Sequence, residues 1–187
     1  MSSVVCTLFE GHYHHGLAAL TNSLYHHGFR GEIWAGYRGQ PPPWARNIVE
    51  RDGTQCFEAA DGLTLRFLKV ETKRHLTNYK ADFMSGLRKN HLPDAGTLFY
   101  CDPDIVVKTG WKFFEQWANG GVALCEDVNS PMHSTHPMRM MWHRFYQPHG
   151  FAVTRELDAY LNAGFVGVSR ANWGFVETWK RVLDLLD

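Results

Sequence analysis

Short apolar runs alternate along the chain with amphipathic stretches, and this pattern predicts an α/β fold. Continuous apolar runs of four to eight residues are typical of strands that are buried on both faces of a sheet. Such runs cover residues 4–9, 33–37, 98–101, 121–125 and 165–168, and a shorter apolar triplet covers 105–107. Residues 63–70 alternate in part between apolar and polar, which predicts a further strand.

The stretches between these runs carry apolar residues three and four positions apart, which predicts helices. The first such stripe contains Leu17, Leu20 and Leu24, and Gly28 follows it as glycine commonly follows a helix end. We expect further helices over residues 74–89, from about 111 and over 175–186, a loop at 39–43, and irregular structure with part helix over 129–150.

Strands that alternate with helices form a mostly parallel sheet with helices on both sides. We therefore expect Rossmann-like αβα layers, built as a single domain over residues 1–187. In sheets of this kind, ligands bind beyond the carboxyl ends of the strands. The loops that follow Phe9, Cys101 and Cys125 are thus the expected places for chemistry.

Composition and charge argue against several classes of protein. The 19 basic and 19 acidic residues give no net charge, whereas a nucleic-acid binder or a polybasic membrane binder usually has a basic surplus. No apolar run approaches the roughly 20 residues of a membrane span, and the N-terminus lacks the basic region of a secretory signal. The 4 cysteines form no CxxC pair, which is typical of free thiols. We expect a cytoplasmic protein without a transmembrane segment or a nucleic-acid partner.

Two carboxylates, Asp102 and Asp104, lie between the apolar runs 98–101 and 105–107. In extended backbone, residues two apart face the same way, and Pro103 favours extended geometry at Asp102. Two carboxylates that point into the same small volume repel each other. A divalent cation such as Mg²⁺ or Mn²⁺ removes this repulsion and also holds phosphate oxygens. The alternative is an Asp-Pro turn whose side chains accept backbone N–H bonds.

The segment from Phe99 to Val107 resembles the DxD element of GT-A-fold, nucleotide-sugar-dependent glycosyltransferases, and is most similar to the family-8 pattern Tyr-Leu-Asp-x-Asp-Ile-Val-Val. Three further stretches resemble the same family in the same order. They are residues 7–13 leading into 20–24, residues 78–80, and residues 161–168 with the sequence Leu-Asn-Ala-Gly-Phe-Val-Gly-Val.

The resemblance implies a hexosyltransferase-like enzyme that retains configuration at the anomeric carbon. It implies that Asp102 and Asp104 hold Mn²⁺ or Mg²⁺ against the diphosphate of a nucleotide-sugar, with a UDP-sugar expected and the acceptor a carbohydrate, lipid or protein. The nucleotide-binding residues that it implies are Thr7, Phe9, Tyr13, Lys80, Asp102, Pro103 and Asp104. The donor-sugar residues that it implies are Asp127, Asn162, Ala163 and Gly164.

Several of these assignments have a structural alternative. Lys80 could lie on a solvated helix face, and Tyr13 could belong to the apolar stripe of a helix that packs in the core. Asp127 could lie in an exposed turn, and the Ala163-Gly164 pair could serve tight strand packing. The histidines near the first loop could reach a phosphate or an acceptor, and those of the irregular segment could bind zinc if further ligands joined them. They are His12, His14 and His15, and His133, His136, His143 and His149.

The chain departs from the family pattern in ways that leave the catalytic residues unknown. Glu10-Gly11 stands where an Asp is common, and Lys80 where Arg is frequent. The family's C-terminal Asp-Gln segment and His-x-x-Gly-x-x-Lys-Pro-Trp element do not occur, so the chain is either a fragment or a reduced relative. The glycine-rich loop that a nucleotidyltransferase or a nicotinamide dehydrogenase has after its first strand does not occur in this sequence, which argues against both classes. A non-catalytic module that binds nucleotide-sugars or glycans remains the alternative function.

Overall fold

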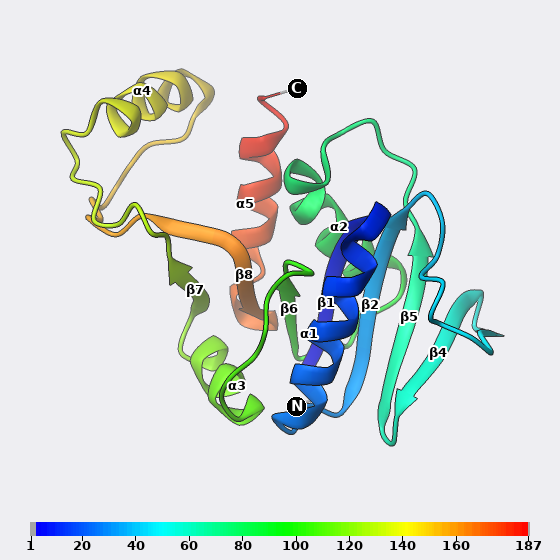
Figure 1. The fold of residues 1–187 in the computed structure, drawn as a ribbon. Helices are drawn as coiled ribbons and strands as arrows, with labels where there is room; N and C mark the ends of the chain where they lie inside the picture. The colour runs from blue at the N-terminus through cyan, green and yellow to red at the C-terminus, as the bar shows by residue number, and fades with distance from the viewer. Residues whose placement is uncertain (1–2, 187) are drawn as a thin grey trace.

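The computed structural model describes residues 3–186, and these residues form one eight-stranded sheet in the order β3-β4-β5-β2-β1-β6-β8-β7 (Figure 1). The strands are β1 Ser3–Glu10, β2 Gly31–Arg38, β3 Val49–Arg51, β4 Thr54–Ala60, β5 Leu63–Lys69, β6 Thr97–Cys101, β7 Val122–Glu126 and β8 Leu161–Ser169. The helices are α1 His14–His26, α2 Leu76–Asn90, α3 Trp111–Asn119, α4 Pro137–Tyr146 and α5 Gly174–Leu183. Single 3₁₀ turns cover Gly11–Tyr13, Gln147–His149 and Arg170–Asn172.

The centre of the sheet is parallel, as the sequence predicts. β1 pairs in parallel with β2 on one side and with β6 on the other, and β2 pairs in parallel with β5. Only β4 and β8 run in the opposite direction among the described strands, because each pairs antiparallel with its neighbours. The mostly parallel α/β sheet is thereby confirmed. Because β1 and β6 are parallel neighbours, their carboxyl ends lie side by side.

Helices cover both faces of the sheet, and β1 contributes to both hydrophobic cores. Val5 and Phe9 pack in the core beneath α1 and α3, whereas Cys6 and Leu8 pack in the core beneath α2 and α5. This division follows from the twofold side-chain period of a strand. Figure 1 shows α1 lying over β1 and β2 on one side of the sheet. No helix of the described residues is both long enough and apolar enough to cross a membrane.

Two strands are not predicted by the apolar pattern. β3 and β4 form an antiparallel hairpin at one edge of the sheet, where polar and apolar side chains mix and β3 is fully exposed. The hairpin turns at Asp52-Gly53, where both residues have positive φ, 51° and 70°. Asp-Gly is the sequence signal that favours such a turn, so the hairpin could have been found from that dipeptide.

The expectation that Asp102 and Asp104 lie in extended backbone between two strands is wrong. The Ile105 backbone N–H donates to the Asp102 carbonyl at 3.1 Å, which closes a turn around Pro103 and ends the strand. The triplet 105–107 is therefore no strand: Val106 is 50% exposed, while Val107 packs under α1 with its N–H donating to Ser23 Oγ at 3.0 Å. The backbone adopts the alternative Asp-Pro turn, but the Asp102 carboxylate accepts from the Lys80 and Tyr100 side chains and not from a backbone N–H.

Candidate functional site

A cavity of about 250 Å³ opens beyond the carboxyl ends of the central strands β1 and β6. Its walls come from the end of β1, the 3₁₀ turn before α1, the start of α2 and the turn after β6. Six of the seven predicted nucleotide-binding residues line it, namely Phe9, Tyr13, Lys80, Asp102, Pro103 and Asp104. Leu8, Glu10, His75, Leu76, Thr77 and Tyr100 complete the lining. Residues that the sequence-based hypothesis groups are thus brought together from four separate elements.

Thr7 does not join them. Its side chain is fully buried on the face of β1 that it shares with Val5 and Phe9, and it does not line the cavity. The Thr7 hydroxyl also has no hydrogen-bond partner among the described residues. The geometry therefore gives no support to the expectation that Thr7 bonds a base. Tyr13, by contrast, is 47% exposed at the cavity and not part of the core stripe.

Asp102 is held by two side chains of the cavity wall. Lys80 Nζ lies 2.7 Å from Oδ1 and 2.9 Å from Oδ2 of Asp102, and the Tyr100 hydroxyl donates to Oδ1 at 3.0 Å. Burial, and then the charge of Asp102, raise the pKa of Tyr100 well above its usual value, so the phenol stays protonated and donates. Lys80 is only 4% exposed, so it is not the solvated lysine of the structural alternative.

The same pair connects to the start of β8. Lys80 Nζ donates to the Ala163 carbonyl at 3.1 Å, and the Asp102 backbone N–H donates to the Gly164 carbonyl at 2.7 Å. Asn162 Oδ1 accepts from the Gly164 N–H at 2.5 Å, and Asn162 Nδ2 donates to Asp127 Oδ2 at 2.9 Å. All four predicted donor-sugar residues therefore belong to one hydrogen-bond network with Lys80 and Asp102.

Close backbone approach explains two glycines at this network. A Cβ on Gly164 would lie 2.7 Å from Asn162 Oδ1 and 2.9 Å from Asp102 Oδ2, both too close for an unshifted structure. A Cβ on Gly16 would lie 2.6 Å from the Pro103 carbonyl oxygen, because the first turn of α1 packs against the Asp-Pro turn. Sequence analysis did not identify Gly16, and an interrupting glycine within a helical stripe was the available signal.

Asp127 is an exposed turn residue as well as a partner of Asn162. Its Oδ1 accepts the Asn129 backbone N–H at 2.9 Å, which is the geometry of an Asx turn. The Asn129 N–H and, after it, the Asn162 side chain lower the pKa of Asp127 below its usual value. The carboxylate is therefore ionised and pre-oriented at the junction between the ends of β7 and β8.

Asp104 differs from Asp102 because its carboxylate is exposed and has no hydrogen-bond or ion-pair partner within residues 3–186. The described residues contain no cluster of three or more His, Cys, Asp or Glu side chains arranged to hold a metal ion. Glu10 also lines the cavity, but Arg38 Nε donates to its Oε2 at 2.7 Å. The residues fit a divalent cation only as two carboxylates at the cavity mouth, with water and ligand oxygens completing its coordination.

Two histidines of the irregular segment make contacts within the protein. His133 lies 3.5 Å from Asp158, with both side chains largely exposed, and His136 is the N-cap of α4, where its Nδ1 accepts the Met138 N–H at 3.3 Å. Since no metal cluster is found in the part of the chain described, the zinc alternative has no support. His75, missed at the sequence level, caps α2 beside the cavity with its Nδ1 accepting from the Thr77 N–H.

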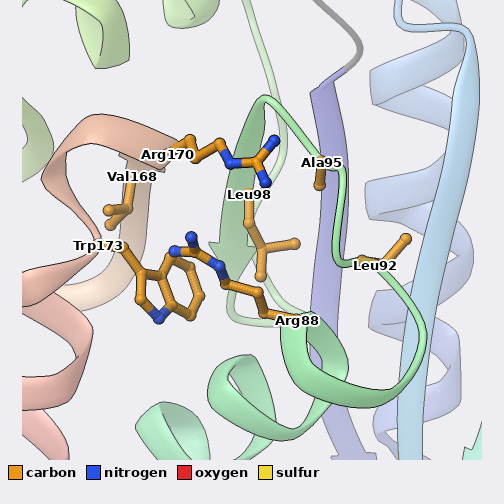
Figure 2. A pocket seen from close by; sticks show the side chains of 7 residues that line it. All are labelled: Arg88, Leu92, Ala95, Leu98, Val168, Arg170 and Trp173. Carbon is orange, nitrogen blue, oxygen red and sulfur yellow. The ribbon is translucent and has the colours of Figure 1, made fainter.

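A second hollow lies at the start of β6, at the other end of that strand from Asp102 (Figure 2). The Arg88 guanidinium stacks over the Trp173 ring at 4.4 Å, and Leu92, Ala95, Leu98, Val168 and Arg170 complete the wall. Its volume of about 10 Å³ holds at most one water molecule. This hollow is too small for a substrate and does not compete with the cavity at Asp102.

No protein-family model matches this sequence, and no curated protein is found as a relative. Many solved structures are similar in fold, and two glycosyltransferases are among them. The bifunctional glycosyltransferase WbbM in its apo form is 15% identical with a TM-score of 0.55, over 99% of this chain and 34% of that one. The glycosyltransferase GlyE of Streptococcus pneumoniae TIGR4 is 15% identical with a TM-score of 0.52, over 97% of this chain and 38% of that one. The chain spans little more than a third of either and has the fold seen in these glycosyltransferases.

Proposed function

We propose that this chain binds a nucleoside-diphosphate sugar and transfers the sugar to an acceptor. One observation carries the proposal: six residues chosen from the sequence as nucleotide ligands line a single cavity, although they come from four elements. The similarity in fold to WbbM and GlyE supports the same class of reaction. The family-8 resemblance, the uridine base, the hexosyl donor and retention of configuration are parts of this proposal.

The positive charge of the site would come from Lys80 and from a divalent cation, Mn²⁺ or Mg²⁺, at Asp102 and Asp104. Bound there, the cation supplies Lewis-acid charge to the leaving diphosphate. Asp104 is the more available carboxylate, because Lys80 and Tyr100 already engage Asp102. Lys80 orients Asp102 and adds charge behind it, which favours binding of a phosphate group at the cavity mouth.

Phe9 and Tyr13 would contact the base, and the network at the start of β8 would contact the sugar. The exposed ring of Tyr13 offers a face for stacking. Asn162 and Asp127 offer an amide and a carboxylate that can bond sugar hydroxyls, and the absence of a Cβ at Gly164 lets its backbone approach Asp102 closely. The proposal also includes a cytoplasmic location, and the 4 free cysteines, three of them buried, support it because free thiols are typical of a reducing compartment.

A binding module without turnover is the second candidate, and one observation favours it. Lys80 and Tyr100 already engage Asp102, and the described residues contain no cluster of three or more metal-binding side chains. A sugar-release assay with UDP-hexoses separates the two functions. Metal-dependent UDP binding with release of free sugar supports the transferase, binding without any release supports the module, and absence of nucleotide binding overturns both.

A further inference from the structure

The small hollow at the start of β6 is lined by Arg88, which has no ion-pair partner in the part of the chain that the structure describes (Figure 2). The Nη1 atom of Arg88 is buried and donates to no atom of the described residues. Other partly buried arginines are paired, since Arg38 lies 2.7 Å from Glu10 and Arg66 lies 2.6 Å from Glu32. A buried charged donor without a partner is costly, so this atom points to a ligand or an ordered water.

A second arginine lines the same hollow. The Arg170 side chain is 58% exposed, and its carboxylate partner, Asp94, is 93% exposed and 3.8 Å away, so this pair neutralises little charge. Burial, and then the charge of Arg170, lower the pKa of Arg88, whereas the charge of Glu177 raises it. Glu177 itself accepts from Trp173 Nε1 at 2.9 Å. The hollow therefore combines two guanidinium groups with too little negative charge to balance them.

The size of the hollow suits one oxygen atom of a larger anion. Its volume of about 10 Å³ is the space that one water molecule needs. The Arg88 guanidinium is held by stacking on the Trp173 ring at 4.4 Å, so its donors are already oriented. Because the Arg170 side chain is exposed, the rest of an anion can lie outside the hollow against that guanidinium. The other lining residues are apolar and offer no competing acceptor side chain; they are Leu92, Ala95, Leu98 and Val168.

We propose that Arg88 and Arg170 bind a phosphate group, with one oxygen accepting from Arg88 Nη1 inside the hollow and the others facing Arg170 at the surface. Phosphate is favoured over a carboxylate or chloride because its charge of about −1.5 to −2 matches two guanidinium groups. The bound group ties the last turn of α2 to the segment between β8 and α5. This site lies at the other end of β6 from Asp102, and the inference does not depend on the proposed function.

The test is a titration of the whole ¹⁵N-labelled chain with inorganic phosphate, glycerol phosphate, acetate and chloride at equal ionic strength, followed by NMR. Trp173→Phe identifies the indole N–H signal of Trp173 among those of the 7 tryptophans, so the readout is local to the hollow. We expect both phosphates to move this signal, and acetate and chloride to move it far less. A stronger response to glycerol phosphate would assign the site to phosphorylated molecules, and a stronger response to inorganic phosphate would assign it to the free ion.

Arg170→Gln should weaken phosphate binding about tenfold, because one charge-assisted contact is lost, and should keep the circular dichroism spectrum because the side chain is exposed. Arg88→Lys should also weaken it, since lysine keeps the charge but not the planar fork. The matched control is Lys89→Gln, because Lys89 is an exposed neighbour of Arg88 that does not line the hollow. A Trp173 signal that phosphate does not move, an equal response to acetate and chloride, or an equal loss in Lys89→Gln would overturn the proposal.

Discussion

The ammonium group of Lys80 lies between both carboxylate oxygens of Asp102, 2.7 Å from Oδ1 and 2.9 Å from Oδ2. The two residues come from α2 and from the turn after β6, on different sides of the cavity wall. This pairing gives Asp102 a structural role that Asp104 lacks, although the sequence presents the two as equivalent members of one motif.

Replacing Lys80 should therefore destabilise the fold. Lys80→Met leaves Asp102 without its partner, and we expect a loss of about 2–3 kcal/mol, below the range for full burial because the Asp102 side chain is 31% exposed. Urea unfolding measures it. Lys89→Met is the matched control, since Lys89 is an exposed lysine of the same helix. Equal stability of the two variants would contradict the structural role of Lys80.

Substitution of Asp102 and substitution of Asp104 should have different effects on stability. Asp104→Asn should leave the unfolding midpoint unchanged, because no described partner is lost, and should weaken Mn²⁺-dependent UDP binding. Asp102→Asn should lower both, since it also removes the charge that Lys80 faces. Thermal shift with and without UDP and Mn²⁺ measures both effects. If Asp104→Asn binds UDP with Mn²⁺ as the natural chain does, the proposed cation site is wrong.

The apolar pattern predicts most of the sheet but not the pairing within the site. β1, β2 and β6 are mostly buried apolar runs and β5 alternates between buried and partly exposed residues, whereas β3 and β4 lie at an edge of the sheet where burial no longer selects apolar residues. The triplet 105–107 misleads because Val107 is buried by α1 and not by a neighbouring strand.

Local sequence patterns also do not predict contacts between segments that are distant in the sequence. Lys80 and Asp102 are separated by 22 positions and meet only because α2 covers β6. Tyr100, two positions before Asp102, was within reach of sequence reasoning, since strand residues two apart face the same way. The contact between Gly164 and Asp102 depends on the antiparallel return of β8, which the apolar runs do not specify.

Gly164→Ala should perturb the site directly. The added Cβ would meet Asn162 Oδ1 and Asp102 Oδ2, so we expect a destabilisation of about 1–3 kcal/mol and weaker binding of a UDP-sugar. Gly86→Ala in α2 is the control, because a Cβ there meets nothing within 4 Å. This control should stabilise the protein by about 0.5–1 kcal/mol. An unchanged Gly164→Ala variant in chemical unfolding and in UDP-sugar binding would remove the steric argument.

Acid should weaken the contact between Glu10 and Arg38 at the cavity rim. The hydrogen bond from Arg38 lowers the pKa of Glu10 from its ordinary value of 4.5. A lowered folded-state pKa contributes stability that is present above the unfolded value and is lost as pH falls through the folded one. Glu10→Gln should therefore flatten part of the decline in melting temperature below about pH 4.5, measured by calorimetry in steps from pH 7 to 3. Parallel pH profiles for the variant and the natural chain would show that this pair contributes nothing.

Calorimetric titration of UDP, with and without Mn²⁺, tests the central claim most directly. Two carboxylates leave an octahedral cation short of ligands, so Mn²⁺ alone should bind weakly, and UDP should bind much more tightly when Mn²⁺ is present. The coupling must be reciprocal, so UDP must raise the affinity for Mn²⁺ by the same factor. ATP should bind less well than UDP. Tight binding of Mn²⁺ by itself, or UDP binding that ignores the metal and is matched by ATP, would contradict the assignment of this cavity as a nucleotide-sugar site.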